Sequence, residues 1–415
     1  MTASPVAVTG IGIVTSLGEG TEANWRALLA GRSGIRRITR FPVDGLKVTF
    51  GGAVDHGGLG ALTVAGRCFA MGRAVAAEAT AQAGLGDAAF AGPLFLALPP
   101  IEMEWPQRRR IAARAAAPRY AAMLAVADEG PEGADHVDFL FGTVADRLAR
   151  AFGTEGAPIS MSTACASGAT AIQTAVEAIR RGDCARALVI GSEGSLQVEA
   201  LIRFGLLSAL STHNEDPAGA SRPFARDRDG FIMAEGAAAL VLESPAAAAA
   251  RGAAPLAYLR GCGEAADTFH RTRSNPDGSA IVRAIAGALA DAGLPPDAVD
   301  YVNAHGTGTP ENDKMECLAL QAVFGERATR LPVSSNKSMI GHTLSAAGTI
   351  EAAFSVLTMR DQMLPPTINH REPDPAIPLD VVPNVARPAA VRTVLSNSFG
   401  FGGQNVSLVL SRDAG

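Results

Sequence analysis

The chain has 415 residues, of which 47% are hydrophobic and 19% charged, so it can bury a large core as one big domain or two fused ones. Its 36 basic and 41 acidic side chains give a net charge of −5, and only 5% of the residues are aromatic. This balance argues against a general nucleic-acid binder, which needs a basic surface and aromatic platforms for base stacking.

Two further features narrow the class of protein. The first residues run directly into a strand pattern, and no apolar stretch reaches the roughly 18 residues that a membrane span needs, so we expect a cytoplasmic protein without membrane insertion. The cysteines are widely spaced and never form a C-x-x-C pair, which indicates neither a disulfide framework nor a zinc cluster. They are Cys68, Cys165, Cys184, Cys262 and Cys317.

The first hundred residues alternate between strand and helix patterns. Residues 6–14 predict a strand, but Gly10 and Gly12 lack the G-x-G-x-x-G spacing of a dinucleotide site. Residues 21–29 predict an amphipathic helix, and residues 60–84 an alanine-rich one. The run QRRR at 107–110 is either a solvated face or a docking patch for an acidic partner.

The sequence predicts that the chain turns sharply at Cys165, between a strand and a helix. A β-favouring run over 158–163 meets small residues, and a helical pattern then continues to Arg181. At such a strand-to-helix elbow, the unpaired N–H groups and the positive helix end favour a thiolate, and the small neighbours leave room for an acyl group. The alternative is a buried structural cysteine.

The chain also repeats its own plan. A strand, an elbow and a helix occur at 159–183 and again at 331–361, with SGATAI and SAAGTI opening the two helices. Two more elements recur in the same order: a strand ending in glycines (6–12 and 256–263) and a strand leading into a glycine (Gly142 and, after 299–304, Gly306). This duplication predicts a layered α/β fold of two related halves with mainly parallel central strands. We place the halves at 1–250 and 251–415, on either side of an alanine-rich seam.

Candidate catalytic groups lie in the second half. His305 directly follows an apolar strand, in the turn HGTGTP, although a histidine at a strand end is usually only a satisfied polar group. Lys337 and His342 lie in the elbow that the repeat equates with the cysteine elbow. Because equivalent elbows face each other in a pseudo-twofold fold, we expect Cys165, His305 and His342 to converge.

The last motif is a glycine-rich loop over 395–405. Its glycines allow backbone N–H groups to approach a ligand, and Phe399 and Phe401 could line or gate an apolar channel. A hairpin with phenylalanines in the core is the alternative.

Taken together, four motifs resemble those of the type II elongating β-ketoacyl-[acyl-carrier-protein] synthases. They are TACASG (163–168), HGTGTP (305–310), NKSMIGH (336–342) and NSFGFGG (397–403). The resemblance implies a thiolase-like fold, a homodimer and an acyl carrier protein as partner, with no cofactor and no metal. It also implies a decarboxylating Claisen condensation, in which an acyl group on the cysteine is extended from malonyl carrier protein.

The resemblance assigns roles residue by residue. Cys165 would be the nucleophile, His305 and His342 would hold the enolate, and Lys337 would tune the site with Glu351 as its partner. The backbone N–H groups of Cys165 and Phe401 would form the second oxyanion hole, and Phe401 with Phe399 the acyl gate. The positions that match pantetheine contacts are Thr272, Thr307 and Thr309.

The chain departs from the family pattern in three places. The basic cluster that faces the carrier is thinned to Arg67 and Arg73, and the loop at 206–215 has no arginine or lysine. The segment at 96–105 lacks the usual glycine-rich turn. We therefore leave carrier preference and chain length open, and we take the arginines at 108–110, with Arg67 and Arg73, as a hypothetical displaced patch for a specialised carrier.

Two rival classes of protein fit the sequence less well than this family, and a third remains open. A thiolase would carry a second catalytic cysteine in the C-terminal glycine loop, but no cysteine follows Cys317. A non-catalytic chain-length-factor-like subunit of a heterodimer would typically lack the nucleophile, which is present. A polyketide-type ketosynthase remains the alternative to fatty acid or related lipid biosynthesis.

Overall fold

The computed structural model describes residues 4–86, 89–128 and 137–415. A large mixed sheet runs through the molecule, in the order β11-β10-β14-β15-β9-β1-β8-β7-β5-β6, with β2 attached to β1. The first part of the chain supplies β1 (Val6–Thr15), β2 (Gly18–Glu19), β5 (Leu94–Ala97), β6 (Ile159–Met161), β7 (Arg186–Glu193) and β8 (Gly236–Glu243). The second supplies β9 (Ala257–Ala266), β10 (Tyr301–Asn303), β11 (Val333–Ser334), β14 (Thr393–Phe399) and β15 (Gln404–Ser411).

The strand order is the same read from either end of the sheet. The series β6-β5-β7-β8-β1 matches β11-β10-β14-β15-β9, and the two series meet where β1 pairs with β9. The layered α/β fold of two related halves is therefore confirmed. One predicted equivalence is wrong: Gly142 precedes α6 (Thr143–Phe152) as its N-cap, and the partner of β10 in the first half is β5, since each pairs in parallel with two strands.

The prediction of mainly parallel central strands is also wrong. Only the outer strands of each half are parallel, and β7-β8, β8-β1, β1-β9, β9-β15 and β15-β14 are all antiparallel. The physical reason is visible at β14 and β15. The short glycine-rich turn between them can join only antiparallel neighbours, because a parallel pair needs a long crossover connection.

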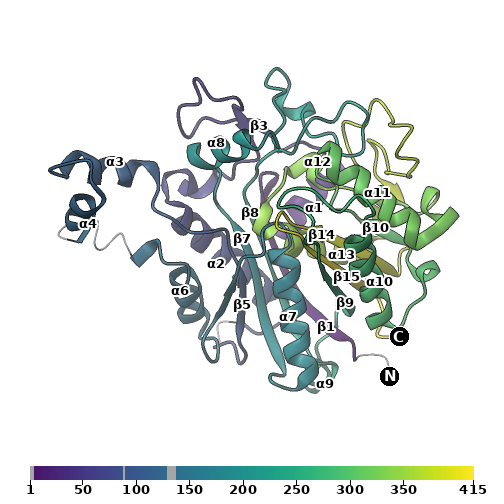
Figure 1. Ribbon diagram of the computed structural model, residues 1–415. Coiled ribbons are helices and arrows are strands. Elements are labelled where there is room, and N and C mark those ends of the chain that lie inside the picture. The colour runs from purple at the N-terminus through teal and green to yellow at the C-terminus, as the bar shows by residue number, and fades with distance from the viewer. Residues whose placement is uncertain (1–3, 87–88, 129–136) are drawn as a thin grey trace.

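Two helices pack against each other in the middle part of the fold (Figure 1). They are α7 (Ser167–Arg181), which ends where the sequence predicts, and α13 (Ala347–Asp361), of which nearly every residue is buried. Their first turns touch backbone to backbone: a Cβ on Gly348 would lie 2.4 Å from the Ala169 nitrogen, and one on Gly168 2.7 Å from the Thr349 nitrogen. The elbows that precede the two helices are thereby held against each other.

Other helices cover the outer faces of the sheet. The predicted alanine-rich helix is α2 (Val64–Gln82), which packs on β1 so closely that a Cβ on Gly10 would lie 2.0 Å from the Ala79 carbonyl oxygen. The glycines of β1 therefore serve helix packing. On the other half, α10 (Ser279–Ala292) packs on β9 and β15, and α11 (Pro310–Phe324) packs on α10.

The remaining elements are short or peripheral. The predicted first helix is confirmed as α1 (Thr21–Leu29). The others are α6, α8 (Val198–Leu206), α9 (Pro245–Ala250), α12 (Lys337–Ile340), β3 (Arg36–Arg37), β4 (Phe50–Gly51), β12 (Met363–Leu364) and β13 (Arg387–Pro388). Short 3₁₀ turns are η1 (His56–Ala61), η2 (Pro217–Gly219), η3 (Pro296–Ala298), η4 (Gly325–Thr329) and η5 (Leu344–Ala346).

Helices α3 (Trp105–Arg114) and α4 (Tyr120–Asp128) project from the body as an arm (Figure 1). None of the residues of α4 is buried, although its sequence YAAMLAVAD is mostly apolar. Among the described residues, no helix combines the length and apolar character that a bilayer crossing requires.

The contact between α7 and α13 yields a stability prediction. In Gly348→Ala the two helices must move apart, and we expect the free energy of unfolding to fall by about 1–3 kcal/mol, the usual cost of overpacking a core. Urea denaturation measures it. The control is Gly205→Ala in α8, where a Cβ would meet nothing within 4 Å and stability should stay equal or rise slightly. Equal losses in both variants would contradict the prediction.

Candidate active site

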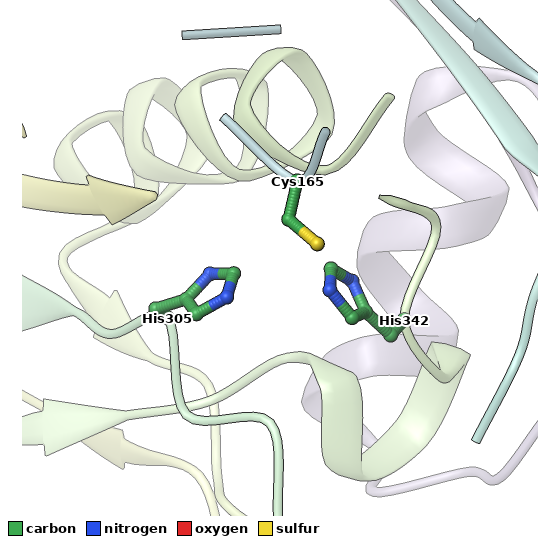
Figure 2. Close-up of side chains that lie close together, drawn as sticks. All are labelled: Cys165, His305 and His342. Carbon is green, nitrogen blue, oxygen red and sulfur yellow. The ribbon is translucent and has the colours of Figure 1, made fainter. Parts of the chain in front are cut away.

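Three reactive side chains from different elements meet below the N-terminus of α7. Cys165 lies in the elbow before α7, His305 follows β10, and His342 follows α12. Their sulfur and ring nitrogens lie within 4.8 Å of one another, and all three residues are buried. Figure 2 shows both imidazoles turned toward the sulfur. The predicted convergence of these three residues is confirmed.

The elbow itself is a strained turn held by its neighbours. Ala164 has a left-handed φ of 50°, which a non-glycine residue rarely adopts. The Ser167 hydroxyl accepts a hydrogen bond from the Thr163 N–H at 2.8 Å and donates one to the Ala164 carbonyl at 2.6 Å. The glycine-rich loop presses on the elbow from the other side, since a Cβ on Gly400 would lie 3.0 Å from the Thr163 carbonyl oxygen.

Burial determines the protonation state of the Cys165 thiol. It raises the pKa of the Cys165 thiol to about 11, although the Phe401 N–H, the charge of Lys337 and the Cys165 N–H all oppose the shift. The expectation that the helix end favours a thiolate is therefore wrong for the resting site. Burial destabilises the thiolate by more than the two N–H groups and the charge of Lys337 stabilise it.

Hydrogen bonds select the same tautomer for both histidines. The Leu344 N–H donates to Nδ1 of His342 at 3.3 Å, which places the ring proton on Nε2. The Lys337 ammonium lies 3.4 Å from Nδ1 of His305 and selects the same tautomer there. Burial first, and then the charge of Lys337, lowers the pKa of both rings well below the usual value, so both are neutral at physiological pH.

The two imidazoles therefore offer Nε2–H donors to one small space. The Nε2 of His342 is buried and has no hydrogen-bond partner among the described residues, so this donor is available to a substrate atom. A thiol and two imidazoles are also the ligand types of a zinc site, but neutral Nε2–H groups are arranged here as donors.

Lys337 is a buried hub behind the histidines. Its ammonium donates to the His305 carbonyl at 2.7 Å and pairs with the Glu351 carboxylate, and both side chains are 1% exposed. Burial raises the pKa of Glu351 to about 7, against the opposing effect of Lys337. The expected pairing of Lys337 with Glu351 is thus present.

Two supporting carboxylates were missed by sequence reasoning. Glu316 accepts from the His305 N–H at 2.9 Å and the Gly306 N–H at 2.8 Å, and so fixes the histidine turn. Glu193, at the end of β7, accepts from the Ser345 N–H at 3.2 Å, and burial raises its pKa to about 7. Glu316 lies in the middle of α11, where a glutamate is an ordinary helix residue, so no local pattern distinguishes its role.

Two cavities meet at the sulfur. One, of about 70 Å³, is the mouth chamber, and the other, of about 390 Å³, is the rear chamber. Both are lined by Cys165, Phe204, Leu344 and Phe401. Thr272, Thr307 and Thr309 line the mouth chamber, as does Phe399, whose ring lies 5.6 Å from that of His305. Phe401 therefore lies at the junction of the chambers, whereas Phe399 lies beside the histidine.

The hypothetical basic patch is wrong in its composition. Arg67 is only 4% exposed, and its guanidinium pairs with Glu235 at 3.1 Å and donates to the Gly194 carbonyl at 2.9 Å. Arg108 is paired with Glu102 at 2.8 Å. A partner at the surface cannot use Arg67, because its buried guanidinium would have to leave the ion-pair cluster that it forms with Glu235 and Arg40.

Comparison with known proteins identifies the family. The family model described as "Beta-ketoacyl synthase, N-terminal domain" matches residues 3–248, and that described as "Beta-ketoacyl synthase, C-terminal domain" matches residues 256–371. The chain belongs to the β-ketoacyl synthase family. As in that family, its activity is that of a condensing enzyme of the acyltransferase class.

Relatives of this β-ketoacyl synthase come from both lipid and polyketide biosynthesis. It is 36% identical to a 3-oxoacyl-[acyl-carrier-protein] synthase 2 of Coxiella burnetii, over 98% of each chain. It is equally 36% identical to the tetracenomycin polyketide synthase ketoacyl synthase alpha subunit of Streptomyces glaucescens, over 98% of this chain and 97% of that protein.

Solved structures of ketosynthases share the thiolase-like fold of this synthase. A β-ketoacyl synthase of Burkholderia phymatum superposes with a TM-score of 0.86 at 32% identity, over 99% of this chain and 100% of the other. A ketosynthase solved with its type II polyketide acyl-carrier protein and bound to the hexaketide gives a TM-score of 0.87 at 31% identity, over 99% of each chain.

The burial of the thiol yields a pH prediction for this β-ketoacyl synthase. Only the thiolate is alkylated, so the rate with iodoacetamide should rise about tenfold per pH unit through pH 9, because the thiol pKa lies at about 11. Peptide mapping by mass spectrometry follows the Cys165 peptide, with Cys165→Ala as the blank. A rate that levels off between about pH 6 and 8 would show that the resting site holds a thiolate.

Proposed function

We propose that the chain catalyses a decarboxylating Claisen condensation, in which an acyl group carried on Cys165 is extended from malonyl-acyl-carrier-protein to give 3-oxoacyl-acyl-carrier-protein. One observation supports this most strongly. A buried thiol lies between two chambers, and two neutral histidines direct Nε2–H donors into the space beside it. A thiol accepts the acyl group, and paired donors can stabilise an enolate.

The first step is acyl transfer. The Cys165 sulfur forms a bond to the thioester carbonyl carbon, the bond from that carbon to the pantetheine sulfur breaks, and the thiol proton ends on the departing sulfur. The N–H groups of Cys165 and Phe401, which already interact with the sulfur, are placed to stabilise the oxyanion of the tetrahedral intermediate. No net proton is consumed, so a resting thiol of raised pKa is compatible with this step.

The second step forms the carbon–carbon bond. The bond from the malonyl α-carbon to its carboxylate breaks, CO₂ leaves, and its electron pair becomes an enolate whose oxygen accepts from His305 and His342. The α-carbon then attacks the acyl carbonyl, the bond to Cys165 breaks, and the sulfur takes up a proton. Lys337 and Glu351 act by positioning: they hold the turn and the tautomer of His305.

The carrier arm and the acyl chain take separate chambers in this proposal. The threonines at 272, 307 and 309 line the mouth chamber and suit the polar pantetheine arm, whereas the larger rear chamber takes the acyl chain. Phe401, at the junction, would gate the passage between them, with Phe399 beside it. Arg271 and Arg273 are exposed at the mouth and make no ion pair with described residues, so they are placed to meet an acidic carrier.

A second copy of the chain is the partner that best fits the exposed apolar surface. The arm exposes Trp105 by 54% and Leu124 by 50%, and Ile159 of the edge strand β6 is 44% exposed. An unpaired strand edge beside apolar side chains favours pairing with another chain. We therefore propose a homodimer that covers the arm and β6.

The acyl substrate belongs to fatty acid or related lipid biosynthesis in this proposal, with a polyketide-type ketosynthase as the alternative favoured by the Streptomyces relative. A non-catalytic chain-length-factor-like role is disfavoured, since Cys165 and both histidines are assembled. Intact-protein mass spectrometry after incubation with acyl carrier proteins of varied acyl groups tests the assignment. Retention of a polyketide chain but no simple acyl group would favour the alternative.

The two histidines yield a kinetic prediction. In His305→Ala or His342→Ala, CO₂ release from malonyl carrier protein should slow by roughly two to three orders of magnitude, the usual cost of losing one oxyanion donor. Radiolabelled CO₂ release gives the rate. Cys165→Ala, which keeps both donors, serves as the matched control and should lose acyl loading but still decarboxylate. Undiminished decarboxylation in either histidine variant would refute the enolate role.

The arginines at the mouth yield a second prediction. Arg271→Ser with Arg273→Ser should lower kcat/KM for carrier-bound acyl groups, and the loss should shrink as salt is raised, because exposed charges are screened. Loading from a small acyl thioester without a carrier should hardly change. Arg109→Ser, on the arm, is the control. A larger loss of kcat/KM in Arg109→Ser than in the mouth variant would contradict the prediction and indicate that the carrier binds at the arm.

A further inference from the structure

An ion pair forms part of the lining of the rear chamber, although most of the chamber wall is apolar. Beyond Cys165 and Phe204, the lining includes Ala200 and Leu207 of the α8 region and Pro99 and Pro100 after β5. Glu102 and Arg203 also line it, as do the polar residues Ser162, Glu193, Ser195, Gln197 and Ser345. An ion pair is an unusual lining for a cavity that receives an alkyl chain, since an apolar tail cannot satisfy either charge.

Glu102 and Arg203 form a bidentate ion pair. One guanidinium nitrogen lies 2.7 Å from Oε2 of Glu102, and the other contacts Oε1. The pair joins the segment between β5 and α3 to helix α8, elements about a hundred residues apart in the chain. Arg108 at the start of the arm donates to the same carboxylate at 2.8 Å and to the Met103 carbonyl at 2.6 Å, and so holds Glu102 in place.

The pair also lies at the protein surface. The side chain of Arg203 is 53% exposed and that of Glu102 is 33% exposed. The two side chains therefore line the rear chamber and reach the protein surface as well. Because exposed ion pairs contribute little stability, such a wall can part at small cost when a longer apolar chain gains contact inside the chamber.

We propose that the Glu102–Arg203 pair is the far wall of the acyl chamber and determines which acyl length is preferred. Chains that end before the pair bind with the wall closed. Longer chains must part the pair and pass between α8 and the arm segment toward the surface. This inference rests on the proposed function, because it needs an acyl group on Cys165.

The test compares acyl length profiles. Each of a series of saturated acyl carrier proteins of increasing length is incubated with the parent enzyme, and acylation of Cys165 is timed by intact-protein mass spectrometry. In Arg203→Ser, the rate ratio of the longer to the shorter chains should rise by roughly tenfold or more, the scale on which single methylene groups are discriminated in apolar pockets. Arg203→Lys, which can still pair with Glu102, should stay close to the parent.

A matched control breaks an ion pair that lines neither chamber. Arg392 pairs with Asp413 at 2.6 Å, and both are exposed, so Arg392→Ser should leave the length profile unchanged. A profile that is the same in Arg203→Ser and the parent would overturn the inference. So would a parent preference for acyl groups ending in a carboxylate that Arg203→Ser abolishes, because Arg203 would then be a receptor for a charged terminus.

Failure of the proposed function gives a different result. If no acyl carrier protein acylates Cys165 in the parent enzyme, the function fails before the wall is tested. The wall can then still be probed with iodoacetamides bearing N-alkyl chains of increasing length, which need no carrier. Faster alkylation of Cys165 by the long reagents in Arg203→Ser than in the parent would support the wall, and equal rates would overturn it.

Discussion

The direct contact of α7 with α13 is the constraint on which the rest of the site depends. At Gly168 and Gly348 the two helices meet without side chains between them, and each is preceded by one of the two elbows. One elbow holds Cys165, and the other holds Lys337 and His342. A side chain added at the crossing would push the two elbows apart and move Cys165 away from His342. The contact that relates the two halves of the fold therefore also positions these reactive groups.

Around this contact, the protein controls charge by burying it. The thiol is kept protonated and the two imidazoles are kept neutral, because a dry site disfavours each charged form. Lys337 is the exception, and its charge is matched by Glu351 and by the His305 carbonyl. The thiol and the two imidazoles therefore carry no charge at rest, which suits the proposed reaction, whose negative charge appears only as CO₂ leaves.

The two ends of the catalytic passage differ in chemistry. The mouth chamber carries threonines and exposed arginines, which suit a polar arm and an acidic carrier, and the rear chamber is mostly apolar, with Glu102 and Arg203 in its lining. The segment that supplies Glu102 leads into the arm, which exposes apolar side chains. The proposed control of acyl length and the proposed dimer contact therefore both involve one peripheral part of the chain, whereas Cys165, His305 and His342 are buried in its interior.

The sequence by itself determined the features that are encoded locally. Small residues around Cys165, the helical periodicity up to Arg181 and the repeated opening of two helices predict the elbow and the duplicated fold, and the four motifs indicate the family. Periodicity and turn chemistry act over a few residues, so a single sequence displays them. The convergence of Cys165, His305 and His342 followed only because the duplication supplied a symmetry argument.

The tertiary structure decided what depends on contacts between distant segments. Strand direction at the centre of the sheet follows from which strands become neighbours, and no local pattern at β1, β8 or β9 records it. In the sequence, nothing distinguishes Arg67 from an arginine at the surface, but in the structure it is buried and paired with Glu235. The raised pKa of Cys165 and the Glu102–Arg203 wall likewise arise from burial and from pairing across about a hundred residues. Hydration and Coulomb interaction act through space, and the chain order does not contain those distances.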